Sequence, residues 1–277
     1  MPDTIAYFQN SLIQYGEYND RIYLIKLAKE DFPNIIKNLN DRALDKGYSK
    51  IFAKIPAYAK EKFEENGFMA EAFIPRFING HDDVYFMGKY FSPARKISNN
   101  SQEINQILKT AKSSPRKKKT ADLPSPFKFK VCELSDAFKI GELYKKIFDT
   151  YPFPIYDPKY ILKTMQENVI YFSIWKKDTI IALASSEMDI ASKNVEMTDF
   201  ATLAPYRGKA LSQYLLKQME NEMSKREIKT AYTIARALSV GINITFAKMG
   251  YTYGGTLKNN TNICGRLESM NVWYKFL

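Results

Sequence analysis

The stretch EMTDFATLAPYRGKALSQYLL, residues 196–216, contains the clearest local pattern in the chain. Its first part continues an apolar segment that predicts a strand over 195–203, and Leu211 and Leu215 recur at helical spacing after it. Between strand and helix lies a short turn, YRGKA at 206–210, with two basic residues and a glycine. The first N–H groups of a helix lack intrahelical partners, and the helix dipole is positive at that end. This strand, turn and helix therefore predict an anion site.

The elements expected on either side of this segment alternate between strands and helices, which indicates an α/β (α+β) protein. The hydrophobic periodicity before it predicts a strand at 127–134, helices near 140–147 and at 158–167, and strands at 169–175 and 179–189. After it we expect a strand at 230–235, a helix at 240–248 and a hairpin of 251–258 and 267–276.

The N-terminal 91 residues repeat part of this order. A helix at 31–46 and a strand at 50–56 are followed by a short helix at 58–66 and strands at 73–77 and 84–91. The motif Phe63-Glu-Glu-Asn-Gly-Phe68 has the spacing of Phe246-Ala-Lys-Met-Gly-Tyr251. We interpret residues 1–91 as a degenerate internal copy that lacks the glycine turn.

The stretch between the two parts is strongly basic. Residues 92–126 contain eight Lys and Arg residues against two acidic ones, and so carry +6 of the net charge of +11. Ser, Asn and Pro are frequent there, which is typical of a linker. We therefore expect an N-terminal region at 1–91, a solvated basic linker at 92–126 that includes a short helix, and a main domain at 127–277. A nucleic-acid-binding tail around 116–119 is the alternative.

Composition excludes several kinds of site. The chain has one histidine, His81, and two isolated cysteines, Cys132 and Cys264, so we expect no metal site and no Ser-His-Asp triad. The longest apolar run, 169–175, is far below the ~18 residues of a membrane helix, and the N-terminus lacks a signal-peptide pattern. We expect a cytoplasmic protein that does not act on membranes or nucleic acid.

The order of elements around the glycine turn resembles the GNAT superfamily of N-acetyltransferases, whose Arg/Gln-x-x-Gly-x-Gly/Ala signature follows a strand and cradles the pyrophosphate of acetyl-CoA. Here Gly208-Lys209-Ala210 matches the end of the signature, while Pro205 occupies its first position. The resemblance implies a mixed, mostly antiparallel sheet flanked by helices and acetyl-CoA as co-substrate. It assigns these residues to the cofactor: Phe200, Ala201, Thr202, Leu203, Arg207, Gly208, Lys209, Ala210, Leu211, Asn243 and Phe246. Phe246 stands where many members have a tyrosine that acts as a general acid. Core packing is the alternative role for Phe246.

A narrower resemblance, to the β-lysine N6-acetyltransferase family, rests on EMTDFAT (196–202), ARA (235–237), NNTN (259–262) and LESMNVWY (267–274). It implies acetyl transfer to the terminal amine of β-lysine, which yields the osmolyte Nε-acetyl-β-lysine. A zwitterionic acceptor requires partners for its carboxylate as well as its amines. The candidates for acceptor binding are Asp199, Arg236, Asn260 and Asn271.

The acceptor amine must lose a proton before it attacks, because a primary amine of pKa ~10.4 is mostly protonated at neutral pH. We expect Glu196 to be the base, since its strand leads into the cofactor turn, with Glu187, Asp199 and Glu268 as other candidates. Strand alternation places Glu196 and Asp199 on opposite faces. Phe246 has no proton to give, so the leaving thiolate would be protonated by Tyr251, by another tyrosine or by water.

Three other functions stay open at this point: acetylation of a different amine, a non-catalytic acetyl-CoA sensor, and a nucleic-acid-binding module. A homodimer is also left open.

Overall fold

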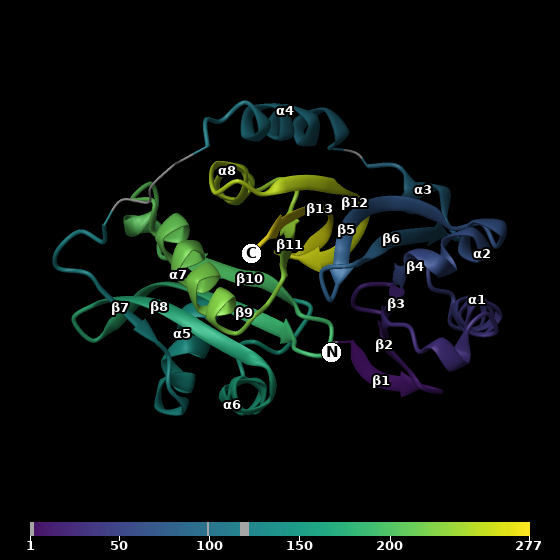
Figure 1. Cartoon of the computed structure of the whole chain (residues 1–277), viewed down its shortest axis with the longest axis horizontal. Coiled ribbons are helices and arrows are strands. Elements are labelled where there is room, and N and C mark those ends of the chain that lie inside the picture. Colours follow the sequence, from purple (N-terminus) through teal and green to yellow (C-terminus); the bar gives the residue numbers. More distant parts are fainter. Residues whose placement is uncertain (1–2, 99, 117–121) are drawn as a thin grey trace.

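The computed structural model describes residues 3–98, 100–116 and 122–277. Thirteen strands of these residues form one continuous mixed sheet in the order β1-β2-β3-β4-β6-β5-β12-β13-β11-β10-β9-β8-β7. Neighbouring strands are antiparallel except for β3–β4 and β10–β11. Helices of the N-terminal half and helices of the C-terminal half both pack against the sheet (Figure 1). The expected mixed, mostly antiparallel sheet flanked by helices is confirmed.

The C-terminal half contains every element that the hydrophobic pattern predicts. Its strands are β7 (Lys128–Val131), β8 (Val169–Lys176), β9 (Thr179–Asp189), β10 (Asn194–Thr202), β11 (Thr230–Arg236), β12 (Thr252–Ile263) and β13 (Arg266–Phe276). Its helices are α5 (Ala137–Ile147), α6 (Pro158–Glu167), α7 (Leu211–Lys225) and α8 (Val240–Lys248). One expected bound is wrong: the first hairpin strand was expected to end at residue 258, but Asn259 to Asn262 also belong to β12, whose pairing with β13 shifts register between Leu257 and Thr261.

The N-terminal half contains more strands than the sequence predicted. Its strands are β1 (Thr4–Phe8), β2 (Ser11–Gly16), β3 (Arg21–Lys26), β4 (Lys50–Pro56), β5 (Met69–Ile78) and β6 (Asp82–Tyr90). Its helices are α1 (Ile35–Lys46) and α2 (Lys60–Glu65), and α3 (Pro93–Lys96) and α4 (Ser101–Lys112) follow. Strands β1 to β3 had no counterpart in the sequence-based prediction.

The two halves repeat the same topology. In the N-terminal half, a parallel pair β3–β4 is joined through α1, and α2 then leads to the hairpin β5–β6. In the C-terminal half, β10–β11 are joined through α7, and α8 leads to β12–β13. The hairpins meet where β5 pairs with β12 in the middle of the sheet. This order is the one that an internal duplication predicts, and the repeated order includes β3, which the sequence did not predict.

The basic segment after β6 is not a solvated linker over its described length. Helix α4 buries Ile104, Ile107, Leu108 and Ala111 and runs across the top of the view above α8 (Figure 1). Arg95 of α3 is 4% exposed, and its guanidinium donates to the carbonyls of Asn19 and Asn259, 2.7 Å from each. The apolar face of α4 explains this packing. Lys117, Lys118 and Lys119 lie outside the described residues, and the boundaries 1–91, 92–126 and 127–277 stay a prediction.

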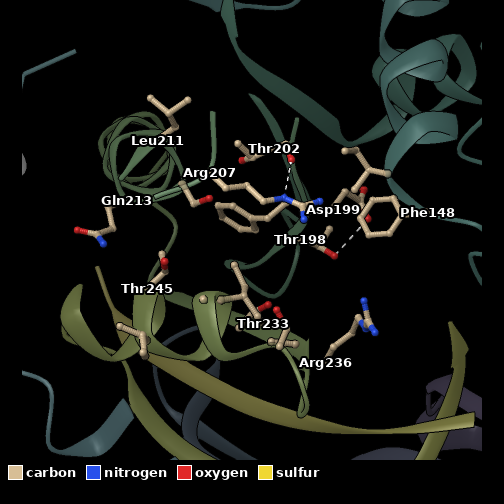
Figure 2. Close-up of a pocket in the computed structure, with 18 of the residues that line it drawn as sticks. Phe148, Thr198, Asp199, Thr202, Arg207, Leu211, Gln213, Thr233, Arg236 and Thr245 are labelled. Atoms are coloured by element: carbon tan, nitrogen blue, oxygen red, sulfur yellow. Dashed lines mark hydrogen bonds between the residues drawn. The ribbon is translucent and has the colours of Figure 1, made fainter. Parts of the chain in front are cut away.

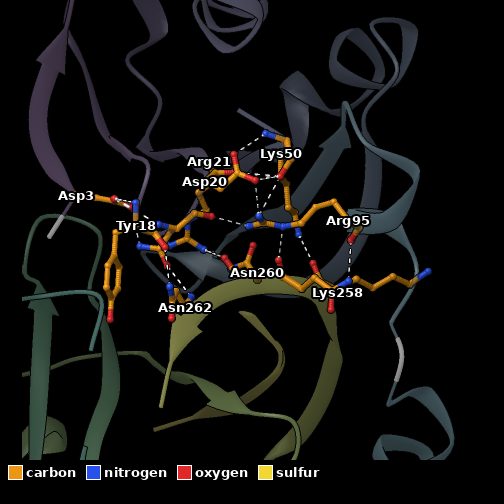
Figure 3. A network of polar contacts seen from close by, with 12 residues as sticks. Asp3, Tyr18, Asp20, Arg21, Lys50, Arg95, Lys258, Asn260 and Asn262 are labelled. Carbon is orange, nitrogen blue, oxygen red and sulfur yellow. Dashed lines mark hydrogen bonds and ion pairs between the residues drawn. The ribbon is translucent and has the colours of Figure 1, made fainter. Parts of the chain in front are cut away.

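A buried polar network joins the N-terminal half to β12 (Figure 3). Lys50 of β4 contacts the Glu71 carboxylate and the Lys258 carbonyl, 2.8 Å from each. Arg21 of β3 donates to the carbonyl of Asn260. A buried charge requires hydrogen-bond partners with good geometry. The contacts of Lys50 and Arg21 with β12 therefore fix the position of the N-terminal half relative to the C-terminal half.

Among the described residues, we find no helix with both the length and the apolar character needed to span a membrane.

Candidate active site

Strands β10 and β11 are parallel neighbours that diverge. Their pairing covers only Asn194–Glu196 of β10 and Thr230–Tyr232 of β11. Beyond it, β10 continues to Thr202 and β11 to Arg236, and a cavity of about 690 Å³ opens between them. The N-terminal ends of α7 and α8 close its other sides (Figure 2). A ligand in this cavity meets the free edge of β10.

The glycine turn forms one end of the cavity. Gly208 and Ala210 have φ angles of 78° and 58°, so the backbone turns through left-handed conformations just before α7. The backbone N–H groups of residues 208–212 have no hydrogen-bond acceptor in the part of the chain that the structure describes. Consecutive free donors at a helix N-terminus bind phosphate groups well. The predicted anion site therefore has suitable geometry.

Arg207 extends from this turn across the cavity. Its Nε donates to the Thr202 carbonyl oxygen over 3.1 Å, and its side chain is exposed (Figure 2). Gly208, Ala210 and Leu211 also line the cavity, whereas Lys209 and Pro205 do not. Of the two basic residues in the turn, Arg207 is therefore the one that lines the cavity, two residues after the position where the signature was expected to begin.

The strand residues assigned to the cofactor divide between two faces of β10. Phe200 and Thr202 line the cavity. Ala201 is buried in the apolar cluster beneath α5 and α6, and Leu203 packs at the edge of that cluster. Ala201 and Leu203 can therefore offer backbone groups but not side chains to a ligand.

Asn243 and Asn271 do not line the cavity. Asn243 is fully buried, and its Nδ2 donates to the Arg236 and Ser239 carbonyls over 3.0 and 2.8 Å. Its Oδ1 accepts from Asn271 Nδ2 over 2.8 Å and from Trp273 Nε1 over 3.0 Å. These bonds hold the turn from β11 into α8, which is itself a wall of the cavity. The structure thus gives both side chains internal partners rather than a ligand.

Phe246 and Tyr251 belong to the core. Phe246 is fully buried and packs edge-on against Phe200 and Tyr251, with ring centroids 5.5 and 4.9 Å away. Burial and the nearby Glu220 carboxylate raise the pKa of Tyr251 well above its usual value. Tyr251 does not line the cavity. The structure therefore supports the packing alternative for Phe246 and does not bring Tyr251 to the predicted catalytic position.

Asp199 lies in the cavity because β10 has a bulge. Its φ angle is 56°, and the pairing of β10 with β9 shifts between Thr198 and Ala201. Its carboxylate accepts from the Tyr151 hydroxyl and from Ser185 Oγ, the latter over 2.5 Å. Ser185 lies two residues before Glu187 on β9, so both point to one face. The expectation that Glu196 and Asp199 occupy opposite faces is therefore wrong, since the bulge turns Asp199 toward Glu196.

Glu196 does not itself line the cavity; it lies on this face two residues before Thr198, which does. Burial raises the pKa of Glu196 to about 8, and the Glu187 carboxylate, directly opposite on β9, is the next cause. The positive charge of Lys54 acts in the other direction and lowers this pKa. The surrounding protein, which displaces part of the water around the carboxylate, and Asp199 also raise the pKa of Glu187, although the residue stays accessible to solvent. A carboxylate with a pKa near the working pH is well suited to accept a proton.

Arg236 lines the cavity but is already paired. Its Nε and Nη2 donate to the Glu268 carboxylate over 3.0 and 2.8 Å, and Arg266 adds a third bond of 3.0 Å. Although burial opposes the effect, these bonds hold the pKa of Glu268 below its usual range. Glu268 is therefore a poor candidate for the base.

Asn260 is buried outside the cavity in the network of Figure 3, where its carbonyl accepts from Arg21. Asn260 therefore does not line the cavity in which the acceptor was expected to bind.

Several cavity residues were not expected from the sequence. Tyr151 comes from the loop before α6, Gln213 from the first turn of α7, and Lys248 from the end of α8. A position in the first helical turn was a usable signal for Gln213. Lys248 and Tyr151 had none, because only tertiary packing brings them to the cavity.

Comparison with known proteins agrees with this geometry. Residues 139–251 match the model of the acetyltransferase (GNAT) family. The chain is 47% identical over 99% of its length to a β-lysine N6-acetyltransferase of Methanococcus maripaludis, of which it covers 98%. It is 34% identical to the N-acetyltransferase YodP of Bacillus subtilis, with 96% of each chain covered. A β-lysine N6-acetyltransferase of Methanosarcina mazei is 33% identical over 82% of this chain and 91% of its own. This chain therefore belongs to the GNAT family of acetyltransferases and is an N-acetyltransferase.

Proposed function

We propose that this enzyme transfers the acetyl group of acetyl-CoA to the terminal (N6) amine of β-lysine. The observation that carries the proposal is the likeness to two β-lysine N6-acetyltransferases, over 99% of the chain for one and 82% for the other. The carboxylates of Glu187, Glu196 and Asp199 on one face support it, because a diamine acceptor carries two positive charges near neutral pH.

The residues of the cavity fit acetyl-CoA as co-substrate, which supplies the acetyl thioester. The free N–H groups of residues 208–212, with Arg207, would hold the pyrophosphate. The unpaired edge of β10 beyond Glu196 would bind the pantetheine amides as an added strand would. Backbone N–H groups of β10 near Phe200 would stabilise the negative charge that develops on the thioester oxygen.

Proton removal is assigned to Glu196. Deprotonating an amine of pKa ~10.4 at pH 7 costs roughly 4.6 kcal/mol. Glu196, with a pKa of about 8, would accept this proton directly or through a water. Asp199 and Tyr151, joined by a hydrogen bond at the cavity wall, would orient the amine. A thiolate of pKa ~8.5 leaves without an acid catalyst, so water suffices in place of the buried Tyr251.

The product of this reaction would be the osmolyte Nε-acetyl-β-lysine. A cytoplasmic enzyme is consistent with two cysteines, Cys132 and Cys264, that are both free. A homodimer stays a prediction.

The test is acetyl-CoA turnover by the purified full chain with β-lysine, α-lysine and spermidine at equal concentration. We expect β-lysine to have the highest kcat/KM, and tandem mass spectrometry to place the acetyl group on N6. A preference for spermidine or α-lysine, or acetylation of the β-amine, would contradict the proposed function.

A further inference from the structure

Strand β4 lies opposite β11 although the two are far apart in the sheet. Four strands separate them in the order β4-β6-β5-β12-β13-β11, so a flat sheet would hold them about 24 Å apart at ~4.8 Å per strand. Nevertheless, Lys54 Nζ of β4 lies 3.4 Å from the Tyr232 hydroxyl of β11. The sheet therefore curls, and β4 of the N-terminal half faces β9, β10 and β11.

Other contacts show the same closure. Lys26 of β3 forms an ion pair of 3.3 Å with Asp189 of β9. Gln14 of β2 donates to the Pro152 carbonyl over 3.3 Å, in the loop that carries Tyr151. The N-terminal half is thus a wall beside the acidic end of the active site.

The facing walls carry opposite charges that influence one another's pKa but form no ion pair among the described residues. Neither Glu187 nor Glu196 has a Lys or Arg nitrogen within 4.0 Å among the described residues, and Lys54 has no carboxylate within that distance. Lys54 Nζ instead lies 3.4 Å from the Tyr232 hydroxyl, and the same hydroxyl lowers the pKa of Glu196. Glu187 is exposed and Lys54 is partly exposed, so solvent reaches the space that these side chains border.

Partly desolvated charges without partners are costly, and a ligand with charges of opposite sign removes that cost. Lys54 requires an anion, and Glu187 requires a cation. A β-amino acid offers both groups on neighbouring carbons. Six single bonds of ~1.5 Å separate its terminal amine from its carboxyl carbon, an extended reach of about 7–8 Å. The distance along β10 from Thr198 to Glu196 is similar, about 7 Å for two strand residues.

We propose that the N-terminal half completes the acceptor site, with Lys54 binding the acceptor's carboxylate and Glu187 binding its second ammonium group. The inference rests on the proposed function and adds the residues that select the substrate. The terminal amine then points along β10 toward Asp199 and the cofactor cavity, and its proton reaches Glu196 through water rather than directly. This assigns to the degenerate N-terminal copy a direct part in recognition.

The test pairs two variants with two trimmed acceptors. Lys54→Met removes the charge at similar length, and the carboxamide of β-lysine removes the charge it would bind. We expect Lys54→Met to raise KM for β-lysine about 10- to 100-fold, the usual effect of losing a charged hydrogen bond, with KM for acetyl-CoA unchanged. For the carboxamide, parent and variant should differ by less than about threefold.

Glu187→Gln is tested with 6-aminohexanoate, which lacks only the second amine. We expect this variant to lose affinity for β-lysine but to treat 6-aminohexanoate as the parent does. Lys60→Met in α2, on the opposite face of the N-terminal sheet, is the matched control, and thermal melting checks that each variant is folded. Equal losses on the acid and the carboxamide, or an unchanged KM for both variants, would overturn the inference. Failure of the parent to acetylate β-lysine would instead overturn the proposed function.

Discussion

Asp199 shows how one residue's backbone conformation assembles this site. In a regular strand, its side chain would lie on the face opposite Glu196. The φ angle of 56° and the accompanying register shift turn it toward Ser185 and Tyr151 instead. Aspartate tolerates this left-handed conformation better than most residues. Carboxylates from two strands therefore gather beside the divergence of β10 and β11.

Their mutual repulsion and burial have a consequence for catalysis. Because the pKa of Glu196 is raised to about 8, its basic form is the minor one at pH 7 and predominates only above pH 8. We expect kcat of the parent enzyme to rise from pH 6 to about pH 8.5 and then level. Glu196→Gln should lower kcat by roughly 10²-fold at pH 7, the usual contribution of a general base.

The loss in Glu196→Gln should shrink as the pH approaches the amine pKa of ~10.4, where neutral amine is abundant. A pH–rate profile of both proteins measures this. If kcat of the variant matched that of the parent from pH 6 to 9, the base would have to be Asp199 or Glu187.

Most elements of the C-terminal half could be predicted because each has an unambiguous period. Strand β8 and the first half of β9 are apolar runs, β10 alternates Val195, Met197 and polar residues, and α7 repeats Leu211, Leu215 and Met219 on one buried face. Strands β2 and β3 escaped prediction because Gln14 and Arg21, which are fully or almost fully buried, interrupt their apolar pattern. Those polar side chains point into contacts with the other half of the chain, which no local pattern records.

The same distinction explains the candidate site. The turn at 207–211 was predictable, since its function depends on local backbone geometry. The roles of Asn243, Asn271 and Tyr251 were not, because their partners come from distant strands and bury them. A role for Lys54 could not be predicted for the same reason, because its neighbour Tyr232 is 178 residues away in the chain.

The turn before α7 supports a prediction about cofactor affinity. A Cβ at Gly208 would meet no atom within 4 Å, so Gly208→Glu changes charge and backbone preference without a clash. We expect a folded protein whose affinity for acetyl-CoA falls at least tenfold, because a carboxylate replaces open space beside the free N–H groups. Titration calorimetry measures it.

Lys225→Glu, the same charge at the far end of α7, should bind acetyl-CoA as the parent does. Near-native affinity in a folded Gly208→Glu protein would remove the turn from the cofactor site.

At the scale of the whole molecule, two copies of one topology form one sheet, and only the C-terminal copy has a glycine turn before the helix that joins its parallel strands. Helix α4 connects them and packs on the C-terminal core through Ile104 and Leu108. Leu108→Ala should therefore destabilise the protein by about 2–4 kcal/mol, as truncation of a buried leucine usually does. Denaturant unfolding measures the loss.

Replacement of residues 116–119 with Ser and Gly tests the basic run that follows α4. None of these residues is among those assigned to the cofactor. We expect its turnover of β-lysine to stay within a few-fold of the parent. A collapse of activity there, or a salt-sensitive nucleic-acid affinity that disappears with the replacement, would favour the nucleic-acid-binding tail.

A crystal structure of the enzyme with CoA and β-lysine tests most directly the claim that the cavity and the N-terminal wall together form one acetyltransferase site. We expect the pyrophosphate on the N–H groups of residues 208–212, and the acceptor between β4 and β10. Its terminal amine should lie toward Asp199 and its carboxylate within hydrogen-bond distance of Lys54. Density for β-lysine elsewhere on the protein, or in the reverse orientation with its carboxylate at Asp199, would contradict the account.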